Sequence, residues 1–125
     1  LQSNKPFSEA GLANANQMIA EAKSEIASSQ RGLDNANEAL RGMDAQRVAG
    51  LRKILEQERY LDTHAVGEGT ARYSPTLINK WSKIVSDYDQ TVARRTTFAN
   101  RLIAAQENLR YATDQQQHML TQKAD

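Results

Sequence analysis

The chain has 125 residues, and its sixteen Lys and Arg side chains nearly balance fifteen Asp and Glu, giving a formal net charge of +1. So small a charge excludes a general attraction to nucleic acid or acidic membrane surfaces, and the absence of cysteine excludes disulfides and thiolate metal sites. Few glycines and prolines among many Ala, Gln, Asn, Glu and Arg residues are typical of long solvated helices. We therefore predict an elongated all-α protein.

The first predicted helix covers residues 8–62. Ser8 is its expected N-cap, because a serine side chain can accept a hydrogen bond from an N–H group of the first turn. Beyond Ser8, mostly apolar residues recur at alternating spacings of three and four, a pattern typical of a coiled coil. The positions of this seam are Leu12, Ala15, Ile19, Ala22, Ile26, Ser29, Leu33, Ala36, Leu40 and Met43.

The seam loses its phase near residue 47 and resumes on a neighbouring track that includes Val48 and Leu51. Such a shift indicates a local change of supercoil. Gly32, Gly42 and Gly50 each lower helix propensity by roughly 1 kcal/mol, or else allow a partner helix to approach closely. We predict that the first helix continues through this stretch to its end near residue 62.

A loop at residues 63–74 is the only place where turn residues cluster. Gly67 and Gly69 can take the positive φ angles that end a helix and reverse a chain. Ser74 followed by Pro75 predicts a new helix, since serine caps a first turn and proline suits the first helical position. The second helix is predicted at residues 75–122.

The second helix carries an apolar stripe that includes Trp81, Val85, Tyr88, Val92, Leu102 and Leu109. Folding the chain about residue 69 places Leu40 near Phe98 and Ile19 near Met119. It also places Arg95 near Asp44, whose ion pair is expected to set the register. We predict a long antiparallel two-helix coiled-coil hairpin, a single domain over residues 1–125, with both termini at the end opposite the loop.

Candidates for catalysis and metal binding are poor. His64 and His118 lie at opposite ends of the predicted hairpin, and Gly67-Glu68-Gly69 lacks the length and the lysine of a phosphate loop. Acidic residues near Arg94 and Arg101 favour a salt-bridged outer face over nucleic-acid binding, and no apolar run is long enough to span a bilayer. We predict a non-enzymatic protein with no catalytic residues, no cofactor, no metal site, no nucleic-acid partner and no direct membrane insertion.

Aromatic residues concentrate around the loop, where Tyr60, Tyr73, Trp81 and Tyr88 lie. One interpretation is that they pack the end of the hairpin. The other is a recognition tip, because Tyr and Trp are favoured binding anchors and a loop on a rigid stalk is free to reach a partner. The partner-binding residues predicted there are His64, Val66, Glu68, Arg72 and Tyr73.

Two phrases of the first helix, Ala13-Asn14-Ala15-Asn16-Gln17 and Leu33-Asp34-Asn35-Ala36-Asn37, resemble the receptor-binding domains of colicins and related bacteriocins. The resemblance implies a central domain excised from a larger secreted toxin, and a chain that begins at Leu1 without an initiator Met agrees with that expectation. It also implies an extracellular protein whose tip docks onto a protein receptor, an outer-membrane protein of a target bacterium.

Two other classes of function remain as alternatives. A secretion-system tip or translocator domain would pack partner helices along the arms, and a structural adaptor would dimerise into a four-helix bundle. An apolar flank formed by Ile54, Ile84, Phe98 and Ile103 favours either of them. A homodimer through the arms, or arms swapped between two molecules, is therefore the alternative to recognition at the tip.

Overall fold

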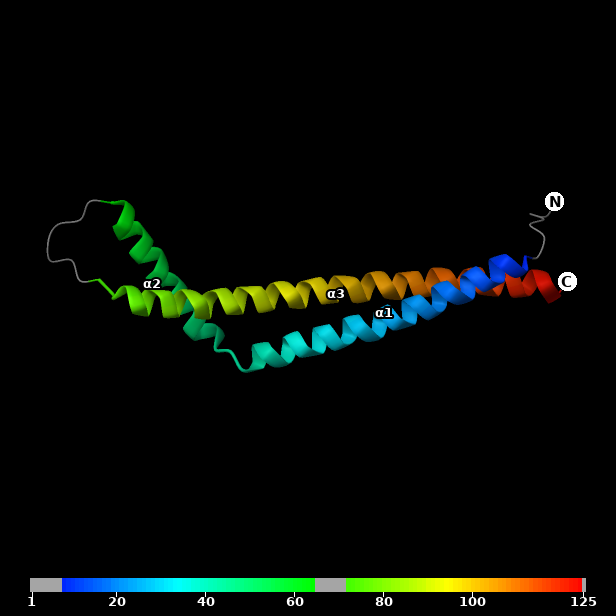
Figure 1. Cartoon of the computed structure of the whole chain (residues 1–125), viewed down its shortest axis with the longest axis horizontal. Coiled ribbons are helices and arrows are strands. Elements are labelled where there is room, and N and C mark those ends of the chain that lie inside the picture. The colour runs from blue at the N-terminus through cyan, green and yellow to red at the C-terminus, as the bar shows by residue number, and fades with distance from the viewer. Residues whose placement is uncertain (1–7, 65–71, 125) are drawn as a thin grey trace. The chain divides into compact units, whose positions relative to one another are not determined.

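A computed structural model describes residues 8–64 and 72–124, and this part of the chain forms three helices and no strand (Figure 1). Helix α1 spans Glu9–Arg41, α2 spans Ala45–Thr63, and α3 spans Pro75–Ala124. The all-α prediction is confirmed, since 93% of the described residues are helical. The prediction of one unbroken first helix is wrong, because α1 and α2 divide it.

Helix α1 begins and ends with local hydrogen bonds. The predicted Ser8 cap is confirmed, since Ser8 Oγ accepts from the N–H of Gly11 at 3.0 Å. At the other end, the N–H groups of Gly42 and Met43 donate to carbonyl oxygens three residues earlier, at 3.2 and 3.0 Å. Such i→i−3 bonds tighten a last helical turn and satisfy carbonyls that would otherwise lack partners. Gly42, which we predicted to lie within the first helix, therefore lies just beyond the end of α1.

Asp44 starts α2. Its backbone is extended, with φ −94° and ψ 102°, and its Oδ1 accepts from the N–H groups of Gln46 and Arg47 at 3.0 and 3.1 Å. This is helix N-capping, which satisfies donors of the first turn. The carboxylate predicted to pair with Arg95 thus caps a helix. Arg95 is exposed, and no ion pair joins these two residues, both of which are described.

The capping role of Asp44 gives a testable prediction. Asp44→Ala is expected to lower the free energy of unfolding by about 1 kcal/mol, because the cap is lost. Urea denaturation of the chain, followed by circular dichroism, measures this change. Asp114→Ala is the matched control, since Asp114 is an exposed carboxylate in the interior of α3. Equal losses in the two variants would contradict a capping role.

Contacts divide the chain into two compact units, which we describe separately. Unit 1 comprises residues 1–34 and 96–125, and unit 2 comprises residues 35–95. In unit 1, small side chains lie at the centre of the interface between α1 and α3. The longer side chains of the predicted seam, such as Leu12 and Ile26, are half-buried. The buried small residues are Ala15, Ala22, Ser29, Ala105 and Ala112.

Close approach of the two helices in unit 1 is sharpest at Gly32. A methyl group on Gly32 would lie closer than 3.0 Å to three atoms of the Phe98 ring. Near the other end of this interface, a methyl group on Gly11 would lie 3.0 Å from the terminal carbon of Met119. The two helices are therefore antiparallel, as predicted. Of Gly32, Gly42 and Gly50, which we considered for the close approach of a partner helix, Gly32 has that role.

The predicted register in unit 1 is wrong by eight residues of α1. Phe98 lies against Gly32 and not Leu40, and Met119 lies against Gly11 and not Ile19. The prediction assumed a straight first helix that advances about 1.5 Å per residue along its partner. Residues 42–44 instead separate α1 from α2, so the residue offset expected for one straight helix does not carry over from α2 to α1.

In unit 2, α2 packs against the first part of α3. Val48, Leu51 and Val85 form the buried core, so the second track predicted around Val48 and Leu51 is the packing face of α2. Partly buried side chains that complete this core are Ile54, Leu55, Trp81, Ile84 and Tyr88.

An ion pair crosses the edge of the unit 2 interface. The two terminal nitrogens of Arg52 donate to the two carboxylate oxygens of Asp89 at 3.0 and 2.7 Å. These hydrogen bonds from Arg52 hold the pKa of Asp89 below its ordinary value, and they raise the pKa of Arg52. The bidentate geometry links α2 to α3 in one register.

Candidate functional site

The loop lies between α2 and α3 as predicted, since α2 ends at Thr63 and α3 begins at Pro75. The predicted restart is also confirmed: the N–H of Leu77 donates to Ser74 Oγ at 3.3 Å, and the N–H of Ile78 donates to the Ser74 carbonyl oxygen at 3.0 Å. We call residues 58–64 and 72–81 the loop base. The predicted contacts Val66 and Glu68, with Gly67 and Gly69, lie outside the described residues.

His64 ends α2. Its backbone N–H donates to the carbonyl oxygen of Tyr60 at 3.0 Å. Its ring Nδ1 lies 2.9 Å from that same oxygen and 3.0 Å from Thr63 Oγ1. The rings of His64 and Tyr60 stack, with centroids 3.9 Å apart and planes 15° apart. His64 therefore acts within the chain as the C-cap of α2.

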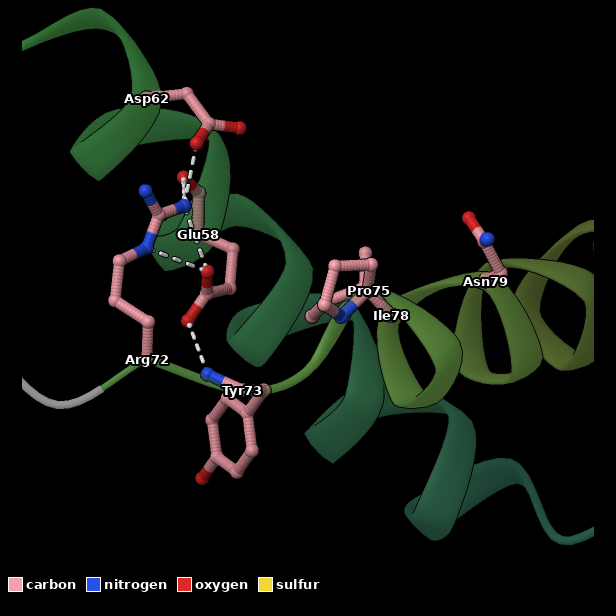
Figure 2. A pocket seen from close by; sticks show the side chains of 7 residues that line it. All are labelled: Glu58, Asp62, Arg72, Tyr73, Pro75, Ile78 and Asn79. Carbon is pink, nitrogen blue, oxygen red and sulfur yellow. Dashed lines mark hydrogen bonds and ion pairs between the residues drawn. The ribbon is translucent and has the colours of Figure 1, made fainter.

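Arg72 reaches back to α2 and lies between two carboxylates (Figure 2). Its Nε and one terminal nitrogen donate to Glu58 Oε2 at 3.0 and 2.8 Å, and that terminal nitrogen also donates to the Glu58 carbonyl oxygen at 3.2 Å and to Asp62 Oδ1. Hydrogen bonds to Asp62 and then to Glu58 raise the pKa of Arg72. The guanidinium thereby attaches the chain before α3 to the last turns of α2.

Tyr73 contacts the same carboxylate. Its backbone N–H donates to Glu58 Oε1 at 3.3 Å, so both oxygens of Glu58 accept hydrogen bonds from this segment. The Tyr73 ring meets Trp81 edge to face, with centroids 4.9 Å apart and planes 77° apart. Tyr73 is nevertheless 48% exposed. The packing interpretation therefore applies to Tyr73, and the recognition interpretation stays a prediction for its exposed part.

Glu58 is the residue of the loop base that we did not predict. It is only 6% exposed, whereas a carboxylate is rarely buried unless it is paired. The available signal was its spacing, because Glu58 follows Leu51 by seven residues and so lies on the packing face of α2. A carboxylate on an apolar track indicates a partner for its charge, and Arg72, whose side chain is 38% exposed, is that partner.

These residues line a hollow of about 370 Å³ at the loop base (Figure 2). One side is formed by the Arg72 ion pairs, and the other by Tyr73 and the first turn of α3. Of the five predicted partner-binding residues, Arg72 and Tyr73 line the hollow, and His64 lies on the same end of α2 as Glu58 and Asp62. The lining residues are Glu58, Asp62, Arg72, Tyr73, Pro75, Ile78 and Asn79.

The loop base presents polar groups and aromatic rings. Within residues 8–64 and 72–124, no group of three or more His, Cys, Asp or Glu side chains could hold a metal ion. None of the helices, as far as they are described, is long and apolar enough to cross a membrane. The hollow is open, and its ionised groups are paired with one another.

The pairing of Glu58 predicts a local effect of mutation. Glu58→Ala is expected to lower the free energy of unfolding by about 1 kcal/mol, because Tyr73 and Arg72 lose their shared acceptor. Hydrogen exchange should show faster exchange of the Tyr73 amide. Glu58→Gln keeps an acceptor oxygen and should preserve more protection. Gln57→Ala is the exposed control on α2; equal exchange at Tyr73 in the Glu58→Ala and Gln57→Ala variants would contradict the assignment.

No protein-family model, curated protein sequence or solved structure matches this chain.

Proposed function

We propose that the chain is a non-enzymatic binding domain whose loop base holds the loop for recognition by a protein receptor. The contact of Arg72 with Glu58 and Asp62 carries this proposal. It attaches one end of the loop to the helical turns that His64 caps at the other end. Anchoring both ends reduces the conformational entropy that binding would otherwise cost.

Exposed apolar side chains at the loop base support recognition there. Tyr60 is 52% exposed, Tyr73 is 48% exposed, and Leu77 is 38% exposed. Tyrosine supplies a large contact area and a polar group at low entropic cost, and it is a frequent anchor of protein interfaces. These three residues of the loop base would offer contact area for a receptor, and Tyr73 also lines the hollow.

In this proposal α3 is the second helix of the predicted coiled-coil hairpin. Its 50 residues support that role, since a helix of this length spans roughly 75 Å. The resemblance to bacteriocin receptor-binding domains extends the proposal to a secreted toxin and to an outer-membrane protein of a target bacterium as the receptor.

Association through the arms is the second candidate, and exposed side chains of α3 in unit 1 favour it. Ile103 is 54% exposed and Tyr111 is 58% exposed. The flank predicted for such association is smaller than expected, however. Ile54 and Ile84 pack against the core of unit 2, and Phe98 lies against Gly32. Of that predicted flank, Ile103 is the fully exposed member.

Site-specific photo-cross-linking separates the two candidates. A photoreactive amino acid at Leu77 should give a covalent adduct with a protein of bacterial outer membranes, and one at Tyr111 should not. Sedimentation should show a monomer. Adducts at Tyr111 alone, together with a tight dimer that Tyr111→Ser dissociates, would instead establish association through the arms.

A further inference from the structure

The hollow of the loop base has two chemically different sides. Tyr73, Pro75 and Ile78 give one side apolar surface. Glu58, Asp62 and Arg72 give the other side ionised groups (Figure 2). A ligand that fills such a hollow needs an apolar group for the first side and a charge suited to the second.

All three ionised groups are engaged within the chain, but Asp62, which pairs with Arg72 through Oδ1, has the most exposed side chain of the three. Glu58 Oε1 accepts from the Tyr73 N–H and Oε2 accepts from Arg72, and the Glu58 side chain is only 8% exposed. Arg72 contacts both carboxylates. Arg72 therefore holds the loop base together, and its predicted contact with a partner stays a prediction.

Asp62 is the group that faces solvent, with a side chain that is 63% exposed. Two carboxylates and one guanidinium line the hollow, so the formal charge of its lining is −1. The neighbouring cations Arg59 and Lys80 do not line it. The excess negative charge lies at the exposed Asp62 carboxylate, where a cationic group of a partner would be favoured.

On the basis of the proposed binding role, we infer that the hollow receives an apolar side chain of a protein segment that carries Lys or Arg beside it. The apolar side chain lies against Tyr73, Pro75 and Ile78, and the basic group pairs with Asp62. Apolar burial supplies most of the affinity, since exposed ion pairs contribute little. The charge pair selects basic partners over acidic ones.

Titration of the whole chain with three short blocked peptides, followed through the chain's amide NMR signals, tests this inference. The first has a central Leu flanked by Lys in a Gly-Ser background, the second replaces each Lys by Glu, and the third replaces Leu by Ser. The first should shift the amides of residues 58–62 and 73–79. The Ser peptide should bind at least about tenfold more weakly, because the apolar group is lost, and the Glu peptide should also bind more weakly.

Asp62→Asn should weaken binding of the Lys peptide by about two- to fivefold. The variant should keep the loop base folded, because Glu58 still holds Arg72. Asp114→Asn, which removes an exposed carboxylate from unit 1, is the matched control and should leave binding unchanged. Equal binding of the Lys and Glu peptides, shifts confined to other residues, or no shifts at millimolar peptide would each overturn the inference.

These outcomes are distinct from failure of the proposed function. Suppose that cross-linking occurs at Leu77 and that the Lys and Glu peptides bind equally. The proposed recognition at the loop base would then hold, and the inference that the partner carries a basic group would be refuted. Cross-linking at Tyr111 alone would refute both.

Discussion

Gly32→Ala is expected to destabilise the protein by about 2 kcal/mol, although alanine is the better helix former. The added methyl group would lie closer than 3.0 Å to three atoms of the Phe98 ring, so the ring or the helices must move. The cost of forcing an extra carbon into this interface exceeds the gain of about 1 kcal/mol in helix propensity. Urea denaturation measured by circular dichroism gives the net change.

Gly50→Ala is the matched control. Gly50 lies within α2, and a methyl group there would meet nothing within 4 Å. The substitution should therefore stabilise the protein by up to about 1 kcal/mol through helix propensity alone. If Gly32→Ala also stabilised the protein, the close approach of Phe98 to Gly32 would be wrong, and with it the register of unit 1.

Leu51→Ala is expected to cost about 2–4 kcal/mol, the largest effect of any substitution considered. Leu51 is 7% exposed and packs with Val48 and Val85 in the core of unit 2. Truncation removes buried methyl groups and leaves a cavity that neighbouring helices fill only in part. Thermal and urea denaturation measure the loss.

Leu77→Ala, at a residue that is 38% exposed, provides the comparison for Leu51. It should change the free energy of unfolding by less than about 1 kcal/mol, because little buried surface is lost. Similar losses at the two positions would mean that α2 does not pack on α3 through Val48 and Leu51. Leu77→Ala then also serves the binding experiments, since it alters the loop base with little effect on stability.

Helix ends were the features most readily predicted, because the groups that make them are adjacent in sequence. Ser8 and Ser74 each accept a hydrogen bond from the N–H three residues later, and Pro75 opens α3. Asp44 forms the same kind of cap. The loss of seam phase near residue 47 indicated a disturbance close by, but it was interpreted as a change of supercoil within one helix.

The loop base could be predicted in part. Tyr73 and Arg72 were chosen for aromatic and charged character beside a loop, and both line the hollow. Their connection to Glu58 could not be read locally, since Glu58 precedes Arg72 by fourteen residues and the contact exists because the chain reverses between them. The only sign in the sequence that Glu58 is buried was its position, seven residues after Leu51 and so on the same face of α2.

The sequence by itself determined the helical class, the loop position and the helix caps, because periodicity, turn residues and capping act over a few residues. The tertiary structure decided which residues of α1 meet α3, because register depends on contacts between residues far apart in the sequence, such as Gly32 and Phe98. It also decided that Arg72 binds Glu58 and Asp62 within the chain, since that contact requires α2 and the start of α3 to lie together. The Arg72 side chain, which we predicted as a contact for a partner, thereby holds the loop base in place.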